Sequence, residues 1–171
     1  VFENNTIAFE PYGATIAAGS DFTEPIESPS VVGYDPFYLV GDQYVSAKFV
    51  YPEIYNIQQN VVINVIYRPA MVNFYIHHHK QDIYDDNYSV TPDKITEGTA
   101  PTGTKVGDGL AFTEEEWPGF KALAYERLEV AADSSTAIEI RYDRKYYLID
   151  FDMNGGYGAE PIYTRYESTV G

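Results

Sequence analysis

The stretch IEIRYD at residues 138–143 shows most clearly how this chain folds. Ile138, Ile140 and Tyr142 alternate there with three charged residues, and a period of two is typical of a strand that buries one face. The stretch VNFYI at residues 72–76 has the same pattern, with apolar side chains at its even positions. Both segments are therefore predicted to be half-buried β-strands, and their apolar positions are predicted to form the core.

Strand signals dominate the rest of the chain, because β-branched and aromatic runs lie between turn residues. Helix signals are confined to a capping-box spacing of Thr113 and Glu116, which Pro118 interrupts, so we expect one or two helical turns at most. The glycine-rich residues 98–109 predict an exposed, mobile loop. The chain is predicted to be mostly β, a β-rich α+β protein with little helix. Further strands are expected at residues 7–9, 44–51, 61–67, 127–130, 147–153 and 162–166.

Composition and charge exclude several classes of function. The chain has 171 residues, with 11 Lys and Arg against 26 Asp and Glu, and a net charge of −15 at pH 7. Phosphate backbones and anionic membrane surfaces repel such a charge, so we expect neither nucleic acid nor membrane as a partner. The chain has no Cys, which excludes disulfides, thiol catalysis and a Cys-ligated zinc site. No apolar run reaches the ~20 residues of a membrane helix.

The sequence repeats itself at an interval of 75 to 77 residues. Three short segments carry this repetition, and each recurs once further along the chain. They are residues 72–76, which recur at 149–153, residues 66–68, which recur at 141–143, and residues 12–16, which recur at 166–170 after twice that interval. Repetition at a fixed interval is typical of tandem structural units.

The interval also sets the expected domain organisation. Roughly 75 residues are enough for one small domain with a core of its own. We expect a first repeat at residues 1–69, a second at 70–145, and the start of a further repeat or a closing hairpin at 146–171. Because no long linker separates these segments, we expect the units to form an elongated rod.

A set of short motifs covers residues 73–156. The motifs are NFYIHHHKQ at 73–81, the glycine-rich segment 98–106, PGF at 118–120, ADSST at 132–136, YDR at 142–144 and FDMNGG at 151–156. Together they resemble the repeat units of Gram-positive bacterial surface adhesins, namely the mucin-binding-protein repeats and the related internalin-type B repeats. The resemblance is fainter over residues 1–68. It rests mostly on turn glycines and core aromatic residues, which specify a fold more than a ligand.

The resemblance implies tandem ubiquitin-like β-grasp domains in an extracellular protein of the bacterial cell surface or cell wall. It also implies a module for cell adhesion that binds host mucin glycans, another host glycoprotein or a host protein, and that adjoins neighbouring repeats of the same chain. The alternative is a structural stalk or spacer repeat, which presents a distal adhesin domain without binding a ligand itself. A third interpretation, an accessory module of a carbohydrate-active enzyme, requires a catalytic domain elsewhere.

Three consecutive histidines at residues 77–79 are the candidate metal ligands. On a strand in phase with the apolar positions before it, His78 points inward, and His77 and His79 point outward together. The two outward imidazoles could bind Zn²⁺ with the Asp residues of segment 82–86, but a structural zinc site needs about four ligands. The alternative is a polar strand end that leads into a loop. We therefore expect no metal and no cofactor, with His77 and His79 as the candidates if a metal binds.

Tyrosine is the most suggestive residue type for ligand binding, because the chain has 17 of them. Tyrosine rings stack on sugars and are enriched at the energetic centres of protein interfaces. Tyr34 and Tyr38 in the first unit are predicted ligand-binding residues, as are Tyr84 and Tyr88, which flank an acidic pair. The alternative is that these rings pack sheets, where aromatic residues are favoured.

Motifs for catalysis are missing from the sequence. We find no nucleophile elbow, phosphate loop or dinucleotide fingerprint, and nothing that sets two carboxylates across a cleft. The segment 150–155 begins like a calcium loop, but the twelfth position of that loop is Pro161 instead of Glu, so we expect a hairpin turn there. The sequence therefore predicts a chain that is not an enzyme and has no catalytic residues.

Overall fold

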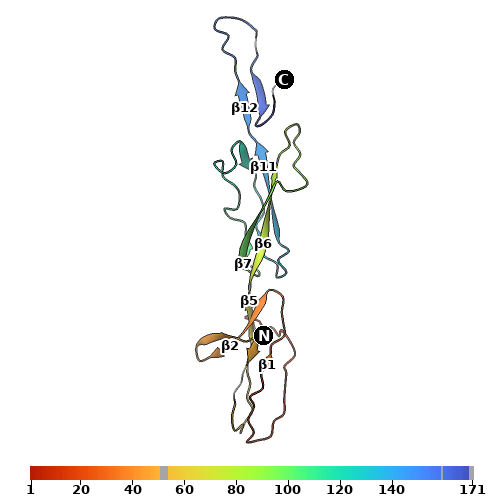
Figure 1. The fold of residues 1–171 in the computed structure, drawn as a ribbon, viewed down its shortest axis with the longest axis vertical. Coiled ribbons are helices and arrows are strands. Elements are labelled where there is room, and N and C mark those ends of the chain that lie inside the picture. The colour runs from red at the N-terminus through yellow and green to blue at the C-terminus, as the bar shows by residue number, and fades with distance from the viewer. Residues whose placement is uncertain (51–53, 159, 170–171) are drawn as a thin grey trace. The chain divides into compact units, whose positions relative to one another are not determined.

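The computed structural model describes residues 1–50, 54–158 and 160–169, and its regular elements are all β-strands (Figure 1). The prediction of a mostly β chain is therefore confirmed. No helix in the described part of the chain is long and apolar enough to cross a membrane. The strands are β1 (Ile26–Glu27), β2 (Tyr34–Val40), β3 (Gln43–Ser46), β4 (Phe49–Val50), β5 (Ile66–Pro69), β6 (Met71–Lys80), β7 (Lys94–Pro101), β8 (Lys105–Val106), β9 (Phe120–Ala122), β10 (Leu128–Glu129), β11 (Ala137–Arg144), β12 (Tyr146–Ile149) and β13 (Ile162–Arg165).

The chain divides into two compact units. Unit 1 comprises Val1–Val72, Pro101–Gly103 and Ala131–Ser134. Unit 2 comprises Asn73–Ala100, Thr104–Val130 and Ser135–Gly171. Two short segments of the later sequence thus belong to the first unit, and each unit is described by itself below.

Unit 2 is built on a four-stranded sheet in the order β7-β6-β11-β9. β11 runs parallel to β6 and antiparallel to β9, so the sheet is mixed. In the parallel register Ile138 lies opposite Ile76, and Ile140 lies opposite His78. Phe74 and Tyr142 belong to the same core face, and these two side chains, Ile76, Ile138 and Ile140 are each 5 % exposed or less. The period of two predicted for these two strands is therefore confirmed.

β7 runs through residues that were predicted to form a mobile loop, and that prediction is wrong for its first part. Gly98 lies inside the strand, and a Cβ atom at that position would stand 2.3 Å from Cζ of Phe74. Glycine is therefore required here by a close approach of the strand to a core ring and not by chain flexibility. Residues 105–106 form β8, which pairs antiparallel with β10.

The capping-box sequence forms a single hydrogen-bonded turn and no helix. The Thr113 N–H donates to Oε2 of Glu116 at 2.8 Å, and the Trp117 N–H donates to the Thr113 carbonyl at 2.9 Å. The indole of Trp117 then packs on the ring of Tyr142, with centroids 4.7 Å apart. The turn therefore places the Trp117 side chain over the core face of the sheet. Pro118 and the following glycine end the turn directly after Trp117.

Unit 1 is less regular than its sequence suggests. It holds the three-stranded sheet β3-β2-β5 and the pair β1-β4. The strands predicted at 7–9 and 61–65 are wrong, because those residues are irregular and Val62 is 78 % exposed. The predicted strand 44–51 is divided between β3 and β4, and its last residue lies outside the described part of the chain. β-Branched composition alone does not make a strand where no neighbouring strand covers the backbone.

β12 and β13 form a two-stranded antiparallel hairpin in which Tyr146 pairs with Arg165. The strand predicted for 147–153 stops at Ile149, and Phe151 and Met153 are 43 % and 42 % exposed. The prediction of a strand is therefore wrong for residues 150–153. The Gly156 N–H donates to the Met153 carbonyl at 2.8 Å, which confirms the turn expected there.

Candidate functional site

Two groups of side chains in the described residues have the chemistry of a binding site, one in each unit. The first is an aromatic depression in unit 1, which we define by Phe2, Tyr34 and Tyr67. The second is a histidine cluster in unit 2, which we define by His77, His79 and Glu139. Neither needs residues of the other unit, so each is described on its own.

The aromatic depression forms where the first residues of the chain lie along β5. The Tyr67 N–H donates to the Val1 carbonyl at 2.7 Å, and Phe2 forms a bridge with Tyr67. The Tyr67 hydroxyl donates to the Pro29 carbonyl at 2.6 Å, which fixes the buried ring. The ring of Phe2 then meets that of Tyr34 edge to face at 5.0 Å. Strand pairing therefore holds three rings of unit 1 together.

These rings form one side of a cavity of ≈ 390 Å³. That volume lies in the range of small-ligand sites, which combine apolar walls with a few polar groups. The polar groups here come from the short turn that follows Phe2, where the Thr6 N–H donates to Oδ1 of Asn4 at 3.0 Å. The full lining is Phe2, Glu3, Asn4, Thr6, Tyr34, Tyr67 and Pro69.

Two charged groups fix the polar side of the depression. Oε1 of Glu3 lies 2.7 Å from Nε of Arg68, and both side chains are partly exposed. The Arg68 guanidinium also lies 4.6 Å from the centroid of the Tyr44 ring. Burial raises the pKa of the Tyr67 hydroxyl, so this hydroxyl remains a neutral donor. The depression thus presents a carboxylate, an amide and a hydroxyl beside aromatic rings.

The four tyrosines predicted from sequence do not gather in one place. Tyr34 lines the depression, and Tyr38 lies four residues further along β2, half-buried and outside that lining. Tyr84 is 86 % exposed in the connection between β6 and β7. Tyr88 is half-buried there, and its hydroxyl donates to Oδ1 of Asp143.

The Tyr88 hydroxyl is engaged in a hydrogen bond within unit 2. Burial, the hydrogen bond to Asp143 and the charge of that carboxylate raise the pKa of Tyr88 to about 12. The Arg141 guanidinium lies 5.4 Å from the centroid of its ring. A ligand can therefore reach this ring only by competing with contacts that unit 2 already makes.

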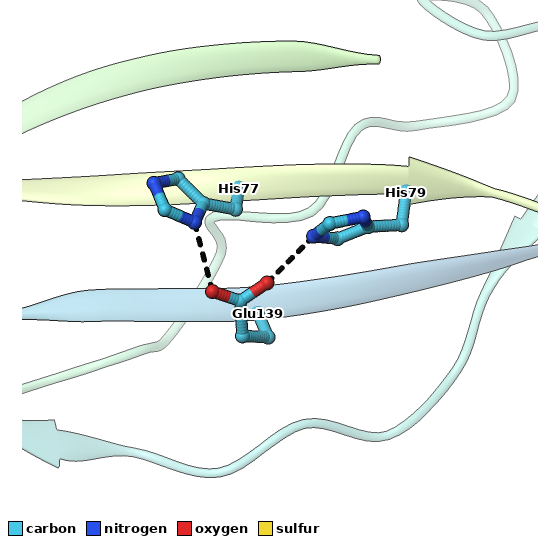
Figure 2. Close-up of side chains that lie close together, drawn as sticks. All are labelled: His77, His79 and Glu139. Carbon is cyan, nitrogen blue, oxygen red and sulfur yellow. Dashed lines mark hydrogen bonds and ion pairs between the residues drawn. The ribbon is translucent and has the colours of Figure 1, made fainter. Parts of the chain in front are cut away.

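The histidine cluster is assembled by the parallel pairing of β6 and β11, which places Glu139 opposite His77 (Figure 2). Oε1 of Glu139 lies 2.8 Å from Nδ1 of His77, and Oε2 lies 2.6 Å from Nε2 of His79. One carboxylate thus bridges two imidazoles that stand two residues apart on one strand. The donor atoms of the three side chains all lie within 4.8 Å of one another.

His79 has acceptors at both of its ring nitrogens. Its Nδ1 lies 2.7 Å from the Ser89 carbonyl oxygen, which can only accept, so Nδ1 carries a hydrogen. Its Nε2 faces the Glu139 carboxylate. Burial alone would raise the pKa of Glu139, but hydrogen bonds from His79 and His77 and their positive charge outweigh it and lower that pKa. The lowered pKa favours the ionised carboxylate of Glu139.

His78 lies on the opposite face of β6, as the sequence predicts, and has a different environment. It is 0 % exposed, with Nδ1 2.8 Å from the Tyr142 hydroxyl and Nε2 2.9 Å from Oγ1 of Thr96. Burial, the charge of Lys94 and the two neighbouring histidines lower its pKa to about 4. His78 is therefore a neutral core residue that satisfies two hydroxyl groups.

The carboxylates that the sequence suggested as partners of His77 and His79 lie elsewhere. Oδ1 of Asp82 accepts from the Tyr84 N–H at 2.8 Å, and Oδ1 of Asp85 accepts from the Asn87 N–H at 2.7 Å, so both shape their own loop. Asp86 pairs with Arg165. Sequence reasoning missed Glu139, because it lies 62 residues from His77 and only the register of two parallel strands brings them together.

The outward position predicted for His79 also needs a correction. Its side chain shares a face with His77, as expected, but the residue is 7 % exposed because the β6–β7 connection that carries Ser89 covers it. Sequence reasoning missed Phe2, Glu3, Asn4 and Thr6 for the same reason that it missed Glu139, since a non-local pairing places them. Comparisons of the chain with protein-family models, with curated proteins and with solved structures found no match.

Proposed function

We propose that this chain is a non-enzymatic repeat module of a bacterial cell-surface adhesin, and that it binds a host mucin-type glycan in the aromatic depression of unit 1. The observation that carries the proposal is the ≈ 390 Å³ cavity in which Tyr34 and Phe2 stand beside Glu3, Asn4 and Thr6. A sugar ring has an apolar face and a rim of hydroxyl groups. Aromatic rings suit the first, and carboxylate, amide and hydroxyl groups suit the second.

The negative charge of the chain favours neutral glycans over acidic ones. The chain carries a net charge of −15, and the charged side chain that lines the depression is a carboxylate. Sialylated and sulfated sugars would approach against this field. The module is therefore proposed to prefer neutral mucin oligosaccharides over their acidic forms, with the preference strongest at low ionic strength.

The sheet of unit 2 supports the assignment to the mucin-binding-protein and internalin-type B repeats. The resemblance to these repeats implies a β-grasp fold for the units of this chain. A β-grasp sheet is mixed, with a parallel pair of strands at its centre. The order β7-β6-β11-β9, with β6 and β11 parallel, is compatible with that plan. The extracellular location at the bacterial cell wall is part of the same proposal and rests on the same resemblance.

The alternative function is a structural spacer that presents another domain without binding a ligand. One observation favours it: the Tyr88 hydroxyl, a candidate ligand contact, is already engaged by Asp143. On this alternative, the aromatic residues serve packing and hydrogen bonding within the units. The two functions differ in a single measurable property, which is saturable binding of a glycan.

Isothermal titration of the intact chain with neutral oligosaccharides released from mucin tests the proposal. We expect saturable binding that Tyr34→Ala weakens at least tenfold, which corresponds to about 1.4 kcal/mol. Tyr55→Ala is the matched control, because Tyr55 is 64 % exposed in the same unit and does not line the depression. Tyr34→Phe keeps the ring and should retain most of the affinity.

Three outcomes would contradict the proposal. Failure of the wild-type chain to bind at high micromolar glycan favours the spacer. Equal affinities of wild type and Tyr34→Ala would move the site away from the depression. Loss of binding in Tyr84→Ala alone would place it in the β6–β7 connection instead.

A further inference from the structure

We propose that His77, His79 and Glu139 of the histidine cluster bind one divalent transition-metal ion of the zinc class. This site is independent of the glycan depression, because it lies in unit 2 and shares no residue with the lining in unit 1. The sequence argued against a metal because two imidazoles on one face fall short of about four ligands, and only the Asp residues of segment 82–86 were offered to complete the set. The structure supplies the third ligand from β11.

The donor set has the chemistry that zinc prefers. Imidazole nitrogen and carboxylate oxygen bind Zn²⁺ at about 2.0–2.2 Å, and two imidazoles with one carboxylate form a recognised three-ligand set. A tetrahedral ion with ligands at those distances separates the ligand atoms by roughly 3.4 Å. The three donor atoms here already lie within 4.8 Å of one another, so small side-chain rotations bring them to that spacing.

The orientation of His79 is a second, independent observation. Its Nδ1–H donates to the Ser89 carbonyl at 2.7 Å, which turns Nε2 toward Glu139. A hydrogen bond from the non-ligating nitrogen to a backbone carbonyl is the usual support of a metal-bound imidazole, because it fixes the tautomer and the ring. In this structure Nε2 lies 2.6 Å from Oε2 of Glu139, and a metal ion would stand between these two atoms.

The cluster is also open to solvent on the side that an ion must use. The side chain of Glu139 is 53 % exposed and that of His77 is 27 % exposed, whereas His79 is covered. Arg141 is two residues from Glu139 on the same face of β11, and its guanidinium lies over the Tyr88 ring. Three protein ligands leave a position for water or another ligand. The ion would then join β6 and β11, two paired strands that are far apart in the sequence.

Isothermal titration of the chelator-treated, intact chain with Zn²⁺ alone tests the inference. We expect one ion per chain, and we expect Glu139→Gln and His77→Gln each to weaken binding at least tenfold, because each removes a ligand and leaves the fold of the exposed face in place. Glu126→Gln is the control, since it removes the same charge from an exposed residue of unit 2 that lies outside the cluster.

A second readout keeps the test independent of the stability of the variants. In two-dimensional NMR of the wild-type chain, Zn²⁺ should shift the imidazole signals of His77 and His79 and leave those of His78 almost unchanged. No heat of binding, or the same affinity in Glu139→Gln as in wild type, would overturn the inference. A zinc-induced shift of His78 equal to that of its neighbours would do the same. Neither result bears on the glycan proposal, which is measured with a different ligand and with variants of unit 1.

Discussion

The two faces of the β6–β11 pair differ sharply although the same two strands build them. On the core face, which buries Ile76, Ile138 and Ile140, the hydrogen-bond partners of His78 are two hydroxyl groups. On the other face, two histidines share one carboxylate. Consecutive residues of one strand therefore take part in a neutral core and in an ionic network, because successive side chains of a strand point to opposite faces.

His78 and His79 differ in their hydrogen-bonding partners, although both are buried. Both are 7 % exposed or less, so burial alone does not separate them. His78 meets two hydroxyl groups, each of which can donate or accept, and remains neutral. His79 meets a carbonyl and a carboxylate, which can only accept. Burial is the first cause of the lowered pKa of His78, and its two hydroxyl partners allow the ring to stay neutral.

The largest effect is expected from the core face. Ile140 is 0 % exposed on the core face, so Ile140→Ala should lower the free energy of unfolding by roughly 3–5 kcal/mol through lost burial and a cavity. Denaturation in guanidinium chloride measures this loss. Leu148→Ala is the control, because Leu148 is 50 % exposed and should cost much less. Equal losses of unfolding free energy in Ile140→Ala and Leu148→Ala would mean that Ile140 does not belong to the core face.

The next effect is a dependence of stability on pH that His78 causes. Its pKa is about 4 in the folded chain against an ordinary value of 6.5, so the unfolded chain binds more protons between these values. The stability that His78 contributes is fully present above pH 6.5 and is lost as the pH falls toward 4, a loss of about 3 kcal/mol. Unfolding measured across this window in chelator-treated protein should show the decline.

Variants separate this window from that of Glu139. His78→Gln, which keeps polar partners for the two hydroxyls, should flatten the curve between pH 6.5 and 4. The pKa of Glu139 is lowered, so its contribution is present above 4.5 and is lost only as the pH falls below that value. A decline that persists unchanged in His78→Gln would contradict the assignment to the core histidine.

Tyr142→Phe is expected to lower the free energy of unfolding by a smaller amount. The Tyr142 hydroxyl lies 2.8 Å from Nδ1 of His78 and accepts from the Phe112 N–H at 2.8 Å. Its removal keeps the ring and leaves two buried polar groups without this partner, which costs about 1–3 kcal/mol. Calorimetric melting measures the change. A variant as stable as wild type would show that water or another group replaces the hydroxyl.

The smallest effect is expected on the other face. Glu139→Gln should change the free energy of unfolding at neutral pH by at most about 1 kcal/mol, because the pairs of a half-exposed carboxylate are screened by solvent. The same denaturation experiment measures it. If this substitution were as costly as Ile140→Ala, the network around Glu139 would be the main stabilising feature of the sheet and the contrast between the faces would be reversed.

Sequence reasoning predicted what depends on local pattern. The alternation in residues 138–143 predicts the burial of Ile138, Ile140 and Tyr142, and the phase of β6 places His78 in the core. The same reasoning was wrong where local signals have no partner strand. The β-branched residues before β5 stay irregular, and Gly98, read as a loop residue, lies in a strand because Phe74 packs against it.

Both candidate sites depend on pairings that the sequence does not encode locally. Glu139 reaches His77 through the register of parallel strands, and Phe2 reaches Tyr34 through a bridge to Tyr67. A pattern with a period of two says which face a side chain takes, but it does not say which strand lies beside it. Two of the three residues of the histidine cluster were therefore predictable, and of the aromatic depression only Tyr34.

Nitrogen NMR of the three imidazoles at about pH 5, midway between the folded and ordinary pKa values of His78, tests the contrast between the two faces most directly. The account predicts that His78, whose pKa is about 4, has one protonated ring nitrogen at this pH, although the histidines on either side of it face Glu139. Protonation of both ring nitrogens of His78 would contradict it.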